Sequence, residues 1–226
     1  MPTVLLIRHG QASFGGADYD VLSATGERQA QIAAAALARR GYEPSRVITG
    51  SMRRQIDTAA AFAGPAPEVD RRWNEYDADD VLTHHSESAA RLGGAAAEGG
   101  EGEPLTSKRF QAILEPALAA WIEIAEGSPA RQSWPQFSGA GSAAFAVLAG
   151  ELGRGETAVV VTSGGTIAAL AGGLLGAPAL AFPALNRVMV NASVTKVAIG
   201  AGGVNLIGFN DHSHLEEVDR GLVTYR

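Results

Sequence analysis

The chain has 226 residues, of which 46% are hydrophobic and 6% aromatic, and it carries a formal net charge of −6 and no cysteine. This length and hydrophobic content predict a single globular domain, 1–226, with a full core. The acidic balance argues against nucleic acid or an anionic membrane as the partner, because both require a basic surface. The lack of cysteine excludes a disulfide framework, a thiolate nucleophile and a cysteine metal site, and it fits a cytoplasmic protein.

The N-terminal segment predicts a buried strand followed by a helix. The apolar run Thr3–Arg8 is too short for a signal peptide and breaks at Gly10, as a strand that feeds a loop would. Thr25 is expected to cap a helix over about 26–40, which Gly41 would end.

The next segment repeats this order and then changes character. We expect a second strand over 46–49, a helix that Ser51 caps and that continues to Gly64, and a third strand near Val69. An acidic cluster and glycine-rich runs follow, so 77–137 is interpreted as an insertion or lid within the domain.

The C-terminal half is expected to contain helices over about 106–126 and 140–152, a strand over 158–161, a helix opened by Gly164 and Gly165, and a hairpin over 194–209. The stretch from Thr157 to Asn186 has no charged residue, but its glycines and prolines favour a buried strand, a turn and a helix over a membrane span. The spacing of Gly172 and Gly176 then predicts tight helix packing.

Alternating strands and helices followed by a hairpin predict an α/β fold. It is a three-layer α/β/α sandwich with a mostly parallel sheet and an antiparallel edge strand. Ligands of such sheets bind beyond the carboxyl ends of the strands. Three expected loops lie there, namely Arg8–Gly10, Ser51–Arg54 and Thr162–Gly165, and each carries groups that suit an anion.

These loops contain the residues that phosphoryl transfer requires. Arg8 and Arg54 can grip a phosphoryl group by bidentate hydrogen bonds, and Gly164 and Ser163 at a helix start add donors. His9 can present one neutral ring nitrogen to phosphorus and form a phosphohistidine.

A carboxyl group is also needed for proton transfer. Glu75 is the candidate acid toward the leaving group and base toward water. Two arginines supply the charge stabilisation that a metal would give, so we expect a metal-independent enzyme without a cofactor. Gln11, Ser23 and His212 are candidates for the substrate pocket.

The motifs in these loops resemble the histidine phosphatase superfamily, which includes the phosphoglycerate mutases. The resemblance rests on Arg8–Gly10, on Leu22–Gly26 and on Ser51–Arg54, and it covers nearly the whole chain. It implies a phosphoglycerate mutase-like fold with His9 as the nucleophile, Arg54 as a phosphate-binding arginine and Glu75 as the acid.

The chain departs from the superfamily pattern at two places. Ser163 stands where the family usually has a second, phosphate-binding histidine, and a serine hydroxyl donates a hydrogen bond but carries no positive charge. Loss of such a donor costs roughly 10²–10³ in rate. Where the mutase branch continues toward an asparagine, this chain has 12–16 instead, which favours a phosphatase over a phosphomutase.

The expected function is therefore a phosphatase of small phosphomonoesters, with the substrate or inorganic phosphate as its ligand. A phosphomutase and a non-catalytic phospho-ligand-binding protein stay open as alternatives. A serine hydrolase is a third, because Asp211 and His214 follow Ser163 in the order of a catalytic triad, although Val161 occupies the first glycine position of the nucleophile elbow. An apolar edge hairpin is compatible with a homodimer.

Overall fold

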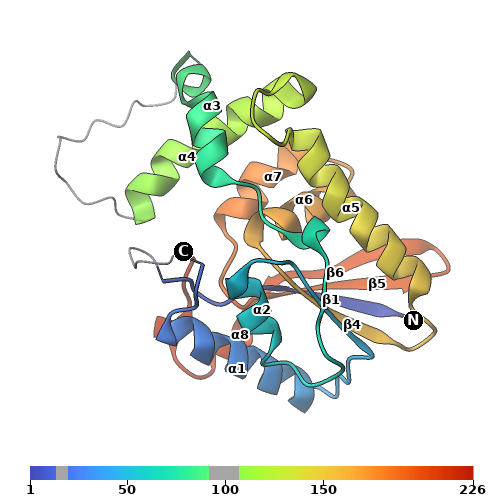
Figure 1. Ribbon diagram of the computed structural model, residues 1–226. Coiled ribbons are helices and arrows are strands. Elements are labelled where there is room, and N and C mark those ends of the chain that lie inside the picture. The colour runs from blue at the N-terminus through green and yellow to red at the C-terminus, as the bar shows by residue number, and fades with distance from the viewer. Residues whose placement is uncertain (14–19, 92–106, 226) are drawn as a thin grey trace. The chain divides into compact units, whose positions relative to one another are not determined.

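The computed structural model describes residues 1–13, 20–91 and 107–225. The chain divides into two compact units, one formed by Met1–Glu75 and Ala140–Arg226 and the other by Tyr76–Gly139 (Figure 1). The segment 77–137 that we interpreted as an insertion falls within the second unit. Its role as a lid stays a prediction.

The first unit is built on one six-stranded sheet in the order β3-β2-β4-β1-β5-β6. The strands are β1 (Thr3–Arg8), β2 (Arg46–Thr49), β3 (Glu68–Val69), β4 (Thr157–Thr162), β5 (Val194–Gly200) and β6 (Gly203–Asp211). The first four pair in parallel, and β5 runs antiparallel to β1 and β6. The expected strands, the mostly parallel sheet and the terminal hairpin with its antiparallel edge pairing are confirmed.

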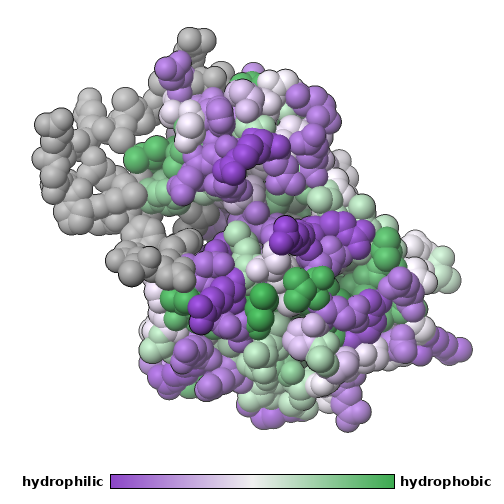
Figure 2. Space-filling model, in the orientation of Figure 1, coloured by the Kyte–Doolittle hydropathy of each residue, from purple (hydrophilic) through white to green (hydrophobic). Residues whose placement is uncertain are grey.

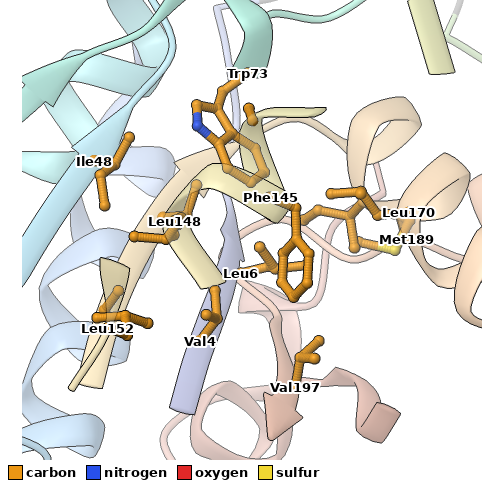
Figure 3. Close-up of a cluster of buried hydrophobic side chains, with 14 residues drawn as sticks. Val4, Leu6, Ile48, Trp73, Phe145, Leu148, Leu152, Leu170, Met189 and Val197 are labelled. Atoms are coloured by element: carbon orange, nitrogen blue, oxygen red, sulfur yellow. The ribbon is translucent and has the colours of Figure 1, made fainter. Parts of the chain in front are cut away.

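Alternating apolar residues give the sheet two buried faces. Leu5 and Ile7 of β1 pack with α1 (Ala24–Arg39) and with α2 (Arg53–Ala59) in one core cluster. Val4 and Leu6 point to the opposite face, where α5 (Trp134–Glu151) and α6 (Gly164–Leu174) supply Phe145, Leu148 and Leu170 (Figure 3). Since side chains alternate along a strand, one apolar run serves both layers. The three-layer α/β/α arrangement follows directly.

The first helix differs from its expected start. Ser23, and not Thr25, is the N-cap of α1, and its Oγ accepts a hydrogen bond from the backbone N–H of Gly26 at 3.1 Å. Thr25 therefore lies inside the helix. The end is as expected, because Gly41 adopts a left-handed φ of 76° that a side chain disfavours.

The second helix, α2 (Arg53–Ala59), is shorter than expected and ends well before Gly64. Ser51 does not cap it. The backbone N–H of Ser51 instead donates to Asn74 Oδ1 at 2.7 Å, and its hydroxyl accepts from Asn74 Nδ2 at 2.9 Å. These bonds tie the loop after β2 to the segment that follows β3.

One boundary in the C-terminal half also differs from expectation. The helix α5 (Trp134–Glu151) begins at Trp134 and not near 140. The backbone N–H of Ser133 donates to Gln136 Oε1 at 2.9 Å, and that of Gln136 donates to Ser133 Oγ at 3.4 Å, so a capping box starts the helix there. Pro135 is tolerated in the first turn, because a backbone N–H at that place would have no acceptor within the helix.

The uncharged stretch folds into β4 and two helices, α6 (Gly164–Leu174) and α7 (Pro178–Arg187). Gly172 does allow tight packing, because a Cβ there would lie 3.1 Å from Pro178. Gly176 instead adopts a φ of 73° with no close neighbour, so the packing role predicted for it is wrong. No helix within the described residues is both long and apolar enough to cross a membrane.

The second unit contains α3 (Ala78–Arg91), α4 (Ser107–Ile124) and the start of α5. Its core is a group of aromatic rings with centroids between 5.5 and 6.0 Å apart: Tyr76, Trp121, Trp134 and Phe137. Trp121 and Trp134 therefore pack within this core. Part of the expected insertion, 92–106, lies outside the described residues.

The surface seen in Figure 2 is mostly hydrophilic, with small, separate apolar areas. The short helix α8 (Ser213–Glu216) and the tail that follows it complete the first unit.

Candidate active site

The three strands whose ends carry the candidate residues are neighbours, in the order β2-β4-β1, and they run in parallel. Their carboxyl ends therefore lie at one edge of the sheet. The backbone N–H of His9 donates to the carbonyl of Thr162 at 2.9 Å, and that of Gly50 donates to Val161 at 3.3 Å. The structure thus brings together the three loops that we predicted.

The imidazole of His9 is buried, and its two nitrogens have different partners. Nδ1 lies 2.7 Å from the carbonyl oxygen of Gly10, and Nε2 lies 3.1 Å from Nε of Arg54. A carbonyl oxygen can only accept and a guanidinium can only donate, so Nδ1 carries the hydrogen and Nε2 carries the lone pair. This arrangement is that of a neutral imidazole with its lone pair on Nε2.

The backbone around His9 is held by side chains from two other segments. The N–H of Gly10 donates to Thr58 Oγ1 at 3.0 Å, and Asn191 Nδ2 donates to the carbonyl of His9 at 3.2 Å. A Cβ on Gly10 would overlap the backbone of Gly26 at the start of α1. The loop therefore requires glycine because two main chains approach each other closely.

A ring of hydrogen bonds joins this loop to the C-terminal tail. The N–H of Gln11 donates to Gln29 Oε1 at 2.8 Å, and Gln29 Nε2 donates to Thr224 Oγ1 at 2.8 Å. Thr224 Oγ1 donates to Asn191 Oδ1 at 3.0 Å, and Asn191 Nδ2 donates to the carbonyl of His9, which closes the ring. Gln29 and Asn191 are fully buried, so the ring fixes the nucleophile loop from inside.

Arg54 is oriented by a carboxylate as well as by His9. Its Nη1 lies 2.7 Å from Asp20 Oδ1, while Asp20 Oδ2 accepts from the backbone N–H of Arg53 at 2.8 Å. The guanidinium is buried and the Asp20 side chain is about two-fifths exposed, at 39%. Asp20 is a site residue that sequence reasoning missed.

Arg8 is held by the segment after α7 and lies at the start of α6. Its Nη1 donates to the carbonyl of Met189, just after α7. A Cβ on Gly164 would lie 3.4 Å from Arg8 Nε and 3.4 Å from Asn186 Oδ1, so the guanidinium lies against the first residue of α6. The structure places Arg8 and Gly164 together, as we predicted.

Glu75 lies at the same helix start. Its Oε2 accepts a hydrogen bond from the backbone N–H of Gly165 at 2.9 Å. Thr166 Oγ1 donates to the carbonyl of Asn74 at 2.9 Å and Thr162 Oγ1 to that of Trp73 at 2.5 Å, so the segment before Glu75 is fixed to the end of β4 and to α6. The positive end of the helix dipole favours a carboxylate at this place.

Ser163 is fully buried and precedes the first residue of α6. Its Oγ accepts a hydrogen bond from Gln55 Nε2 at 2.8 Å. It is the N-cap residue of α6 by its backbone conformation, but its side chain makes no capping hydrogen bond to the helix backbone.

The three candidate pocket residues lie in two places. Ser23 Oγ donates to Gln11 Oε1 at 2.9 Å, beside the nucleophile loop. His212 Nδ1 is bonded to the carbonyl of Asn210 at 2.7 Å, at the turn from β6 to α8. Contact of these residues with a substrate stays a prediction.

The buried His214, which the sequence offered only as a member of a serine hydrolase triad, contacts the backbone beside the loop that carries His9. His214 Nε2 lies 3.1 Å from the carbonyl of Ala192, and the N–H of Ala192 donates to the carbonyl of Arg8 at 3.1 Å. Burial lowers the pKa of His214, against an opposing effect of its hydrogen bond to Ala192.

Comparison with known proteins agrees with this geometry. The family model for the histidine phosphatase superfamily (branch 1) matches residues 4–212. The chain belongs to this superfamily.

Two similar histidine phosphatases are mycobacterial. A glucosyl-3-phosphoglycerate phosphatase from Mycolicibacterium vanbaalenii is 28% identical over 216 residues, which are 86% of this chain and 83% of the relative. The structure of a mycobacterial glucosyl-3-phosphoglycerate phosphatase in complex with VO3 is 26% identical, with a TM-score of 0.65 over 93% of this chain and 99% of that one. These relatives are phosphatases of the same superfamily.

A third structure agrees in fold alone. The phosphoserine phosphatase from Entamoeba histolytica, in complex with phosphoserine, is 18% identical, with a TM-score of 0.67 over 95% of this chain and 100% of that one. The phosphoglycerate mutase-like fold that we expected is thereby confirmed.

The serine hydrolase alternative is wrong for this histidine phosphatase. In the part of the chain that the structure describes, Ser163 bonds to Gln55, while Asp211 is paired with Arg40 at 3.1 Å and His214 bonds to Ala192. These three residues do not form a triad.

The remaining histidines have structural partners. His84 forms an ion pair with Asp80, and the buried His85 is bonded to Ser128 Oγ at 2.8 Å. Among the described residues, no three His, Asp or Glu side chains are grouped as a metal site.

Proposed function

We propose that this histidine phosphatase hydrolyses small phosphomonoesters through a phosphohistidine on His9. The observation that carries the proposal is the neutral imidazole, with Nδ1–H held by the carbonyl of Gly10 and the Nε2 lone pair beside Arg54. A pure phosphate binder does not require a nucleophile prepared in this way.

The first step transfers the phosphoryl group to the enzyme. His9 Nε2 forms a bond to phosphorus, and the bond from phosphorus to the ester oxygen breaks. Glu75, in its protonated form, gives its proton to the leaving alkoxide, which departs as the alcohol. In the second step, Glu75 takes a proton from water as the water oxygen attacks phosphorus, and the N–P bond breaks to restore the neutral imidazole.

Arg8 and Arg54 bind the phosphoryl oxygens and offset the charge of the transition state. Nε of Arg54 lies beside His9 Nε2. On substrate binding, we expect the guanidinium to turn from Nε2 to a phosphoryl oxygen, while Asp20 keeps hold of Nη1. The two arginines are the reason for proposing a reaction that requires neither metal nor cofactor.

The ligand proposed for the site is a small phosphorylated molecule or inorganic phosphate. The structure of the mycobacterial glucosyl-3-phosphoglycerate phosphatase has also been solved in complex with inorganic phosphate, which supports a ligand of this kind. A phosphatase is favoured over a mutase because the segment after Gly10 lacks the expected mutase pattern. We also propose a cytoplasmic location from the composition; the homodimer through the edge hairpin stays a prediction.

The test is hydrolysis of an aryl phosphate between pH 5 and 8, without added metal. Wild type is expected to turn over and His9→Ala to be inactive. His84→Ala is the matched control, because His84 lies on α3 of the second unit and is paired with Asp80. Binding of inorganic phosphate by an inactive wild type would favour the alternative, a non-catalytic phospho-ligand-binding protein.

A further inference from the structure

Gln55 of α2 and Ser163 at the end of β4 form a buried polar pair. Both side chains have no exposed surface, and Gln55 Nε2 donates to Ser163 Oγ at 2.8 Å. A buried amide and a buried hydroxyl each lose their hydrogen bonds to water, so such a pair persists only where its bonds are satisfied.

The amide of Gln55 is fixed in one orientation. Its Nε2 lies 3.2 Å from the carbonyl of Trp73, and its Oε1 accepts from the N–H of Met52 at 3.3 Å. A Cβ on Gly50 would overlap Gln55 Oε1, so the glycine leaves the space that the amide fills. Since Trp73 can only accept and Met52 can only donate, Nε2 is the nitrogen and Ser163 Oγ is the acceptor in the pair.

This bond determines what the Ser163 hydroxyl can do. One lone pair of Oγ is used by Gln55, and the side chain does not cap α6, so the hydroxyl hydrogen can be donated to a ligand. Ser163 follows Thr162, whose carbonyl accepts from the N–H of His9. Ser163 therefore lies at the edge of the sheet that carries His9.

We propose that Gln55 is a positioning residue that holds the Ser163 hydroxyl as an uncharged donor to the transferring phosphoryl group. This inference rests on the proposed phosphatase function. The pair takes the place at which the superfamily usually has a charged histidine, and the amide occupies space beside the shorter serine side chain.

An uncharged donor differs from an imidazolium in its response to pH. A serine hydroxyl and an amide do not titrate between pH 5 and 9, whereas an imidazolium loses its charge at about pH 6.5. The titratable and charged groups around this place are Arg8 and His9 after β1, Arg54 on α2, and Glu75 at Gly165. Any acid or alkaline limb of the wild-type rate must therefore come from these groups and the substrate.

The experiment is a double-mutant cycle on aryl phosphate hydrolysis. Ser163→Ala removes the donor and is expected to lower kcat by about 10²-fold, with a smaller change in KM, because the bond strengthens in the transition state. Gln55→Met keeps the side-chain length and removes the amide, and it is expected to lower kcat by about 10-fold in the wild-type background and not at all in Ser163→Ala. Gln111→Met, on α4 of the second unit, is the control for the same change elsewhere.

A second arm uses pH. The variant Gln55→Ala combined with Ser163→His is expected to lose activity relative to wild type as the pH rises through about 6.5, where an imidazolium deprotonates. A parallel pH profile for this variant and wild type would overturn the proposal. Equal kcat losses for Gln55→Met in both backgrounds would also overturn it, because Gln55 would then act independently of Ser163.

The outcomes separate this inference from the proposed function. If wild type neither hydrolyses aryl phosphate nor binds vanadate, both are wrong. If wild type is active and Ser163→Ala keeps the wild-type kcat and thermal midpoint, only the role of Gln55 and Ser163 is wrong. The second result does not depend on the folding of Gln55→Met.

Discussion

The loops after β1 and β4 end two neighbouring parallel strands, yet they are built differently. The loop after β1 carries a titratable imidazole whose hydrogen bonds determine which nitrogen has the lone pair. The loop after β4 carries an uncharged serine held by Gln55. The other polar groups of this loop are the backbone N–H groups at the start of α6. The N–H of Gly165 donates to Glu75.

The two loops share support from α2 and differ in the rest. The N–H of Gly10 donates to Thr58, and Gln55 donates to Ser163. Buried polar residues of α1 and of the C-terminal tail add bonds to the loop after β1, whereas the segment after β3 adds bonds to the end of β4 and to α6. We propose a division of labour, in which the first loop presents His9 as the nucleophile and the second presents neutral donors beside Glu75, the proposed acid. The following predictions test that division, starting with the largest effect.

Substitution of Arg54 should have the largest effect on catalytic efficiency. Arg54→Ala removes both the partner of His9 Nε2 and a phosphate-binding guanidinium, so kcat/KM is expected to fall by about 10³-fold or more, with loss of vanadate binding. Arg53→Ala is the control, because that side chain is exposed and paired with Asp57 at 3.6 Å. Unchanged vanadate affinity in Arg54→Ala would remove this residue from the phosphate site.

Substitution of Glu75 should impair proton transfer and not phosphate binding. Glu75→Gln is expected to lower kcat about 10²-fold for an alkyl phosphate, whose leaving alkoxide needs a proton, and much less for an aryl phosphate with a good leaving group. The glutamine retains an oxygen that can accept from the N–H of Gly165. Equal losses for both substrates would show that Glu75 is not the acid.

The ring of hydrogen bonds through Gln29, Thr224 and Asn191 should contribute more to the order of the loop that carries His9 than to the chemical step. Thr224→Val removes the bond from Thr224 Oγ1 to Asn191, and we expect the free energy of unfolding to fall by about 1–3 kcal/mol and kcat by roughly 10-fold. Urea unfolding and initial rates measure the two effects. Thr83→Val on α3 is the matched control, and an identical response of the two variants would argue against the ring.

Lowering the pH should reduce the stability that His214 contributes beside the loop that carries His9. Burial holds the pKa of His214 below its unfolded value of about 6.5, so the unfolded chain takes up a proton first as the pH falls. The free energy of unfolding is therefore expected to fall from pH 7 to pH 5, and His214→Gln to reduce that slope. Part of the slope should persist, because burial also lowers the pKa of His85. Identical slopes in urea unfolding would contradict this assignment.

Much of the site could be predicted because its parts lie at the ends of strands. Arg8, His9 and Arg54 follow short apolar runs whose parallel pairing brings their carboxyl ends together. Asn191 and Thr224 could not be found in this way, because each acts through a partner far away in the chain and neither belongs to a local pattern.

Gln29 and Gln55 show the limit of pattern reading in another way. Each is a polar residue on the buried side of a helix, and sequence alone does not say which buried group it meets. The helix ends were misplaced for a similar reason. Ser23 and Thr25 are both acceptable caps, and only the backbone conformation decides between them.

The most direct test of the account is detection of the phosphorylated enzyme. Wild type mixed with excess aryl phosphate and denatured at alkaline pH, where phosphohistidine survives, should show one added phosphoryl group by intact mass, located on His9 by peptide mapping. His9→Ala should show none. Turnover without a phosphorylated His9, or a phosphoryl group on another residue, would contradict the proposed mechanism.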